Sequence, residues 1–233
     1  MYPAAKMRNG LIDEVFHFSN AGYYWVRTFR GPAGWKTEPI GQQGDGLEAW
    51  IHRDDRPTTR FVFQRNRINS DIAAVVFASW DGKELRRETL DPSITAHYRA
   101  MAVLPDETVL IPVLKGSPIG YPQFALARRA PNGSWQYEPL PLGGGLLAFG
   151  CNRKGVVHLV EWRQPEARML VWTHRKDGWR FCYLGAIWNP GPAFAAVQYD
   201  GQGNPIVVVC TGTGDVARQG VQVFRTAGGR LSL

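Results

Sequence analysis

The sequence predicts an all-β protein, a five-bladed β-propeller with four antiparallel strands in each blade. A pattern of four apolar stretches separated by polar turns occurs five times in the 233 residues. A glycine turn marks each copy, at Gly34, Gly82, Gly133, Gly178 and Gly228, so the copies lie 45 to 51 residues apart. A period of about 40–50 residues with four strands per unit is typical of a propeller. No segment shows the 3.6-residue period of a helix.

The repeat also predicts the domain organisation. Since the blades of a propeller share one core, we expect a single domain, with blades at about residues 1–42, 43–91, 92–142, 143–186 and 187–233. Each blade is then continuous in sequence, and the ring closes by packing of the fifth blade against the first. If the strand assignment is shifted by one, a closing blade shared by both termini is the alternative.

The strands follow one order in every copy. The predicted first strands contain small residues, which suit the crowded axis of a propeller, and they cover residues 4–7, 47–52, 98–104, 146–151 and 194–199. A turn rich in Gly, Asn, Asp and Pro follows each first strand, as a hairpin requires. The second strands are runs of Val, Ile and Phe, which indicate burial on both faces of the sheet.

Composition limits the partners. The formal charge is +7, from 27 Lys and Arg against 20 Asp and Glu, which favours acidic ligands. The cations are dispersed rather than clustered, so nucleic acid is not an expected partner.

Cys151, Cys182 and Cys210 lack a metal-type spacing and predict buried free thiols. There is no signal-like or membrane-spanning apolar segment, so we expect no membrane partner and a cytoplasmic protein, although a mature secreted domain would have a similar N-terminus.

The glycine turns resemble a known motif. RKDGW, APNGSW and GPAGW lie between third and fourth strands and are similar to degenerate Asp boxes, which mark this hairpin in sialidase-like propellers. The leading Ser or Thr is absent, and only Asp81 and Asp177 supply the acid. Blade number and length are similar to those of tachylectin-like lectins, whose repeats are more nearly identical. The turn residues also have a structural explanation, because Gly adopts positive φ, Asp or Asn caps the turn and Trp packs between blades.

The predicted ligand site is the face where inter-blade loops and second-to-third-strand loops converge. These loops are rich in Arg, which fits carboxylates, and in aromatic rings, which stack on sugars. The candidate ligand-binding residues are His17, Arg65, Arg67, Arg99, Trp162, Arg163, Trp188 and Arg218. The resemblance to sialidases implies that Arg65 or Arg67, Arg163 and Arg218 hold a substrate carboxylate.

The candidate catalytic residues, if the protein is an enzyme, are Asp45, Glu161, His97 and Tyr121. The resemblance to sialidases implies a Tyr121–Glu161 nucleophile pair with Asp45 as the acid. Five-bladed glycosidases instead place three carboxylates around the axis, and Asp45, Glu48 and Glu161 are the candidates, although the other inner strands lack an acid at the matching start. His97 is either an acid–base residue or a hydrogen-bonded channel histidine.

No metal or other cofactor is expected. His17, His52, His158 and His174 show no metal-ligand spacing. The glycine run at 143–145 is not followed by a helix, so it is not a phosphate loop.

These features predict a lectin-like propeller that binds a glycan or another polar, ring-bearing ligand at its axial face, with an acidic or polar ligand as the partner. The first alternative is a glycosidase-, sialidase- or lyase-like enzyme that uses the same pocket. A protein-interaction scaffold with a protein partner and a cyclase that shapes a natural product are further alternatives.

Overall fold

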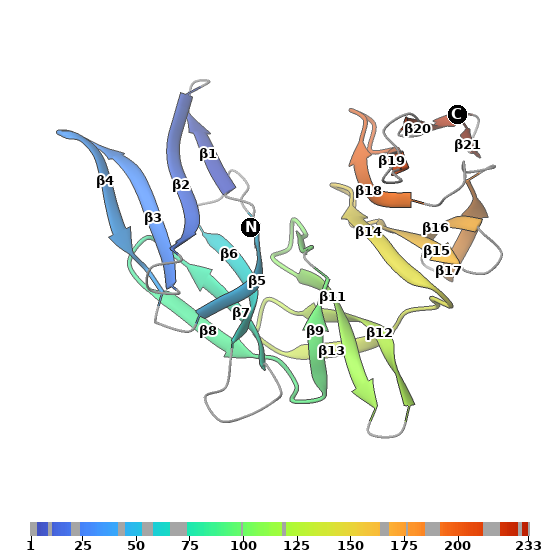
Figure 1. Cartoon of the computed structure of the whole chain (residues 1–233), viewed down its shortest axis with the longest axis horizontal. Coiled ribbons are helices and arrows are strands. Elements are labelled where there is room, and N and C mark those ends of the chain that lie inside the picture. Colours follow the sequence, from blue (N-terminus) through green and yellow to red (C-terminus); the bar gives the residue numbers. More distant parts are fainter. Residues whose placement is uncertain are drawn as a thin grey trace. The chain divides into compact units, whose positions relative to one another are not determined.

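The computed structural model describes residues 4–8, 11–19, 24–41, 45–52, 58–65, 74–98, 100–117, 120–163, 168–175, 177–184, 192–211, 220–227 and 230–232. Within these ranges all twenty-one regular elements are strands, and they pair into antiparallel sheets (Figure 1). The all-β prediction is therefore confirmed. A search of the described residues finds no helix able to cross a membrane.

The first two sheets are four-stranded meanders, in which each strand pairs with the next one in the chain. Sheet 1 contains β1 (Ala4–Arg8), β2 (Leu11–Ser19), β3 (Tyr24–Gly31) and β4 (Gly34–Pro39). Sheet 2 contains β5 (Asp45–His52), β6 (Thr59–Arg65), β7 (Ala74–Trp80) and β8 (Leu85–Thr89).

The remaining sheets repeat this order. Sheet 3 contains β9 (Ile94–His97), β10 (Ala102–Val103), β11 (Val109–Ser117), β12 (Gly120–Arg129) and β13 (Trp135–Pro139). Sheet 4 contains β14 (Gly145–Cys151), β15 (Val157–Arg163), β16 (Arg168–Arg175) and β17 (Gly178–Tyr183). Sheet 5 contains β18 (Pro192–Tyr199), β19 (Pro205–Thr211), β20 (Gly220–Ala227) and β21 (Arg230–Ser232).

The first strand of sheet 3 differs from the prediction. We expected one strand over residues 98–104, but β9 ends at His97 and β10 begins at Ala102. Both pair with β11, with His97 opposite Val113 and Ala102 opposite Leu110. Four residues separate His97 from Ala102, but only two separate their partners on β11. The two extra residues interrupt the hydrogen-bond ladder as a β-bulge does. Alternating apolar residues do not reveal such an insertion.

The chain divides into two compact units. Unit 1 comprises residues 1–101, 111–127 and 135–137, and unit 2 comprises residues 102–110, 128–134 and 138–233. In unit 1, aromatic rings of sheets 1 and 2 form the core. Phe16, Trp25, Phe61 and Phe63 have no exposed surface, and the Trp25 and Phe61 ring centroids are 5.3 Å apart. Large rings thus fill the space between these two sheets.

The core of unit 2 consists mainly of aliphatic side chains. Val160, Met169 and Val171 of sheet 4 pack against Val207 and Phe224 of sheet 5, and all five are at most 1% exposed. These residues come from the second and third strands, which agrees with the predicted burial of the most apolar strands.

Tryptophans after the glycine turns join neighbouring sheets. In unit 1, Trp135 Nε1 of β13 donates a hydrogen bond to Glu88 Oε2 of β8 over 3.1 Å. In unit 2, Trp179 Nε1 of β17 donates to Glu138 Oε1 of β13 over 2.9 Å. Both bonds connect the outermost strand of one sheet to that of the preceding sheet, which agrees with the structural explanation of these tryptophans.

One turn recurs between the first and second strands in unit 2. It spans 104–108 in sheet 3, 152–156 in sheet 4 and 200–204 in sheet 5. In each copy the first N–H donates to the fifth carbonyl, and the fourth N–H donates to the first carbonyl. The fourth residue has positive φ, with values of 69° at Glu107, 80° at Gly155 and 85° at Gly203. This conformation favours glycine.

In sheets 3 and 4, the first residue of the turn contacts the glycine of the next turn. A Cβ added to Gly155 would lie 3.7 Å from Leu104 Cδ1, so the leucine side chain covers that glycine. At the same position in sheet 4, Asn152 Nδ2 donates to the Gly203 carbonyl over 2.9 Å. The contact between successive turns is thus made by packing of Leu104 on Gly155 and by a hydrogen bond from Asn152 to Gly203.

The cysteine prediction is correct in one part and wrong in another. All three cysteines are free thiols, but Cys182 is exposed, while Cys151 and Cys210 are partly buried. Cys182 lies on β17, the outermost strand of sheet 4, and outermost strands are the least covered part of a sheet.

Replacing Gly203 by alanine is expected to lower the free energy of unfolding by about 1–2 kcal/mol, since an L-residue is strained at positive φ. The added Cβ would also lie 3.4 Å from Asn152 Nδ2. The matched control is Gly201→Ala in the same turn, where a Cβ meets no atom within 4 Å. This control should be neutral or stabilising by up to about 1 kcal/mol. Urea denaturation of both variants measures the difference, and equal stabilities would contradict it.

Acid should weaken the turns. Hydrogen bonds donated within their own turns hold the pKa of Asp81, Asp91, Asp106 and Asp200 below the usual value of 3.8. The stability that these carboxylates contribute is present above the unfolded pKa and is lost as the pH falls towards the lower folded pKa. Between about pH 5 and about pH 3, the melting temperature should fall less for Asp200→Asn than for the wild type. An unchanged pH profile would contradict this assignment.

Candidate functional site

The candidate site lies at one end of sheet 4, within unit 2. Here β14 begins and β15 ends, with Gly145 opposite Trp162, and β16 begins at Arg168, opposite Arg163. β17 ends at the same place with Tyr183. Antiparallel pairing therefore gathers four strand ends, and Glu161, Trp162 and Arg163 from the sequence prediction are among them.

Glu161 is completely buried at the centre of this end. Its Oε1 accepts hydrogen bonds from the Gly143 N–H over 2.7 Å and from Arg163 Nε over 2.9 Å. Its Oε2 accepts one from Trp172 Nε1 over 2.6 Å. A buried carboxylate needs such donors to compensate for lost hydration. The catalytic role of Glu161 stays a prediction, and this geometry favours a positioning role.

The glycine run lies directly against the end of β15. A Cβ on Gly144 would lie 2.2 Å from the Trp162 carbonyl oxygen, and one on Gly143 would lie 3.4 Å from the Arg163 guanidinium. A side chain at Gly144 would force the loop away from β15, whereas a Cβ at Gly143 would only contact the Arg163 guanidinium. The run therefore serves close packing, and it lets the Gly143 N–H reach the Glu161 carboxylate.

The two predicted ligand-binding residues in this segment face opposite sides of the sheet. Trp162 is partly buried and packs against the core between sheets 4 and 5. Arg163 shares the face of Glu161, as alternation along a strand requires, and its side chain is 32% exposed. Of these two residues, Arg163 is thus the one that a ligand can reach.

Three aromatic residues, Trp172, Phe181 and Tyr183, continue this face and are termed the aromatic platform. The ring centroids of Trp172 and Phe181 are 4.9 Å apart, and those of Phe181 and Tyr183 are 5.5 Å apart. Phe181 and Tyr183 are 49% and 51% exposed. The Arg168 guanidinium carbon lies 5.4 Å from the centre of the Tyr183 ring. The aromatic platform thus lies beside Arg168, and Arg163 lies opposite Arg168 on β15.

Sequence reasoning missed the aromatic platform and Arg168. The segment from 179 to 183 reads WRFCY, with a ring at every second position. In a strand this spacing places all three rings on one face, so the pattern was available. It was interpreted only as a fourth strand after the glycine turn.

The other predicted site residues that the structure describes belong to unit 1. In unit 1, Arg65 is exposed at the end of β6, His17 Nε2 lies 3.2 Å from Thr28 Oγ1, and His97 is 5% exposed on β9. Asp45 and Tyr121 lie on β5 and β12, but their side chains are outside the described residues. The remaining four, Arg67, Arg99, Trp188 and Arg218, lie wholly outside the described residues.

The described side chains include no group of three His, Cys, Asp or Glu residues that could hold a metal ion. The chemistry at this end of sheet 4 is instead that of flat apolar rings beside guanidinium groups. Such surfaces bind flat, polar molecules with an acidic group.

No protein-family model matches the sequence, and no curated protein matches it. Solved structures do match. A luciferin-regenerating enzyme shares 12% identity over 95% of this chain and 70% of its own, with a TM-score of 0.54. The exo-β-1,3-galactanase of Phanerochaete chrysosporium, solved with β-1,3-galactotriose, is 11% identical. The match covers 79% of this chain and 48% of the galactanase, with a TM-score of 0.50. A thermostable family-43 glycoside hydrolase is 10% identical. The match covers 99% of this chain and 91% of the hydrolase, also with a TM-score of 0.50.

These likenesses concern the fold, because the identities are low. Family-43 glycoside hydrolases and sialidase-like propeller enzymes are among the matching structures, and they support a β-propeller. The number of blades and the degenerate Asp-box motif stay predictions.

Replacing Glu161 by glutamine should lower the free energy of unfolding by about 2–3 kcal/mol, because a buried charged acceptor with three donors is lost. The NH2 group of the new glutamine cannot accept a hydrogen bond, so it would leave at least one of these N–H donors without an acceptor. Glu84→Gln is the control, since the Glu84 side chain is 67% exposed and pairs only with Arg86 among the described residues; it should change stability by less than about 0.5 kcal/mol. Chemical denaturation compares the two, and a neutral Glu161→Gln would contradict the positioning role.

Proposed function

We propose that this protein is a carbohydrate-binding β-propeller whose five sheets are its five blades. The glycan lies on the aromatic platform beside Arg168, with Arg163 opposite Arg168 on the neighbouring strand. The observation that carries the proposal is the pair of half-exposed rings, Phe181 and Tyr183, held at fixed geometry by Trp172. Exposed apolar surface of this kind marks interaction sites.

The rings suit a sugar better than a wholly apolar ligand. The C–H face of a pyranose stacks on an aromatic ring, while its hydroxyl groups require polar neighbours. Arg163 and Arg168 provide these neighbours from β15 and β16. The Trp172 ring is anchored by its hydrogen bond to Glu161, so part of the platform is ordered before the ligand arrives. Such preorganisation lowers the entropic cost of binding.

The charge of the site favours an acidic sugar. Glu161, its buried carboxylate, is already in contact with the Arg163 guanidinium. Arg168 adds a second cation at the exposed edge. Guanidinium groups bind carboxylates through paired hydrogen bonds, and the chain as a whole carries a formal charge of +7. The preferred ligand is therefore a glycan that contains uronic acid.

Hydrolysis of a glycosidic bond is the second candidate function. It is favoured by the likeness of nearly the whole chain to a family-43 glycoside hydrolase. The reaction requires two carboxyl groups across the scissile bond. Asp45, at the start of β5, is the proposed acid or base of this function, and Glu48 on the same strand is the candidate for the second carboxyl group. His97 and Tyr121 are further candidates. A lectin binds the glycan without turnover.

Binding is tested with polygalacturonate and neutral galactan. Tyr183→Ala and Arg168→Ala should each weaken polygalacturonate binding by about tenfold, because one ring or one guanidinium contact is lost. Trp35→Ala is the control, since Trp35 is also a half-exposed ring, 54% exposed, but lies on β4 of sheet 1. Affinity electrophoresis or calorimetry measures the affinities. Equal losses in all three variants, or no binding by the wild type, would contradict the proposal.

Turnover is tested by release of reducing ends from a panel of glycans. If the protein is a hydrolase, Asp45→Asn should abolish release while binding to polygalacturonate remains, because the acid or base is lost but the platform is intact. Binding by the wild type without release from any glycan would identify a lectin instead.

A further inference from the structure

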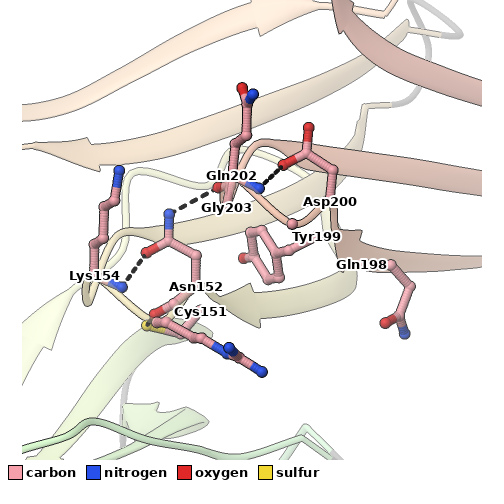
Figure 2. A pocket seen from close by; sticks show the side chains of 10 residues that line it. Cys151, Asn152, Lys154, Gln198, Tyr199, Asp200, Gln202 and Gly203 are labelled. Carbon is pink, nitrogen blue, oxygen red and sulfur yellow. Dashed lines mark hydrogen bonds between the residues drawn. The ribbon is translucent and has the colours of Figure 1, made fainter.

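A cavity of about 470 Å³ opens in unit 2 at the opposite ends of β14 and β15 from the aromatic platform (Figure 2). It lies between the turn that follows Cys151 and the turn that follows Tyr199. The lining residues are Cys151, Asn152, Arg153, Lys154, Gln198, Tyr199, Asp200, Gly201, Gln202 and Gly203. A volume of this size is within the range of small-molecule sites, about 300–1,000 Å³.

Hydrogen bonds hold the two walls of the cavity in a fixed relation. Asn152 Nδ2 donates to the Gly203 carbonyl, and Asn152 Oδ1 accepts from the N–H groups of Lys154 and Val156. In the other wall, Asp200 accepts three hydrogen bonds, two from Asn204 and one from the Gln202 N–H. Each turn is therefore locked internally, and Asn152 connects them.

The charged groups give the cavity a positive balance. Arg153 and Lys154 are exposed, and among the described residues neither side chain pairs with a carboxylate. Asp200 is the one lining carboxylate, and its oxygens already serve its own turn. Two cations beside one committed carboxylate attract an oxyanion.

The remaining lining groups are neutral and suit a polyhydroxylated ring. Burial raises the pKa of the Cys151 thiol to about 11, and burial likewise raises the pKa of the Tyr199 phenol. The Tyr199 hydroxyl lies 3.1 Å from His158 Nδ1, which fixes the ring. Figure 2 shows this ring between Asn152 and Asp200, while Lys154 and Gln202 extend to the same side of the two turns.

Gly150 makes room for the Tyr199 ring. A Cβ at Gly150 would lie 2.8 Å from the Tyr199 hydroxyl oxygen and 3.0 Å from Val197 Cβ. The glycine thus allows sheet 5 to approach β14 closely enough for the ring to line the cavity. An aromatic wall beside amide and cationic groups is a combination that binds sugars with an anionic substituent.

We propose that this cavity is a second ligand site, separate from the aromatic platform, and that it binds an anionic molecule of monosaccharide size. Arg153 and Lys154 interact with the oxyanion, Tyr199 contacts the ring, and Gln198 and Gln202 hydrogen-bond to hydroxyl groups. The shared chemistry is an oxyanion on a sugar-sized body, which either a phosphate ester or a carboxylate supplies.

Calorimetric titration with glucose 6-phosphate, glucuronate, glucose and inorganic phosphate tests the proposal. At least one of the two anionic sugars should bind, about tenfold or more tightly than glucose or inorganic phosphate, because ring and charge are recognised together. Which of the two binds better identifies phosphate ester or carboxylate as the source of the oxyanion. Equal binding of inorganic phosphate would overturn the proposal, since it would indicate a charged surface without a ring site.

Two variants locate the binding. The Arg153→Ala and Lys154→Ala double variant should weaken binding at least about tenfold, whereas Lys83→Ala, an exposed lysine in sheet 2's outer turn, should not. Gly201→Trp keeps both charges and is expected to fill the cavity, because open space surrounds a Cβ at this position. It should abolish binding while thermal unfolding stays unchanged. Wild-type affinity in either cavity variant would overturn the proposal. Tyr183→Ala should bind like the wild type, which separates this site from the aromatic platform.

Discussion

Each sheet of unit 2 depends on its neighbour through side-chain contacts made at fixed positions of the repeat. Asn152 donates to Gly203 in the next turn, and Trp179 donates to Glu138 on the preceding outer strand. A four-stranded meander must bury its apolar face against another layer. The contacts at the turn and at the outer strand fix the position of one sheet on the next, and the aliphatic core then fills the space between them. Gly155 and Gly203, which have positive φ, belong to the turns that make these contacts.

The Glu161 carboxylate has a comparable role at the other end of sheet 4. It joins an inter-sheet loop, a strand-end arginine and a third-strand tryptophan through three hydrogen bonds. A charge with no exposed surface is tolerated only because these donors replace water. Arg163 and Trp172 are ordered as a result. A buried acid in a predicted active site is thus also a scaffold for the residues around it.

Strands β14 and β15 connect two surfaces of different chemistry. One end presents half-exposed rings beside Arg168 and its strand partner Arg163, and the other encloses a cavity between two locked turns. The same turn geometry occurs in sheet 3, where Leu104 replaces Asn152 and covers the next glycine by packing. The cavity therefore depends on side chains particular to sheets 4 and 5, which shows how diverged repeats make distinct sites on equivalent backbone.

The sequence by itself determined the all-β class, the order of strands within the four-stranded sheets and the positions of the turns in unit 2. These follow from local rules, namely the burial of Val and Ile runs and the preference of Gly, Asn and Asp for turns. It also identified Arg163 as a candidate for a ligand site. Only the tertiary structure decided the split of the predicted strand 98–104, the burial of Glu161, the assembly of Phe181 and Tyr183 with Arg168, and the cavity beside Tyr199. Each of these depends on which side chain of one strand meets which residue of another, and a repeat pattern records spacing along the chain but not contacts across it.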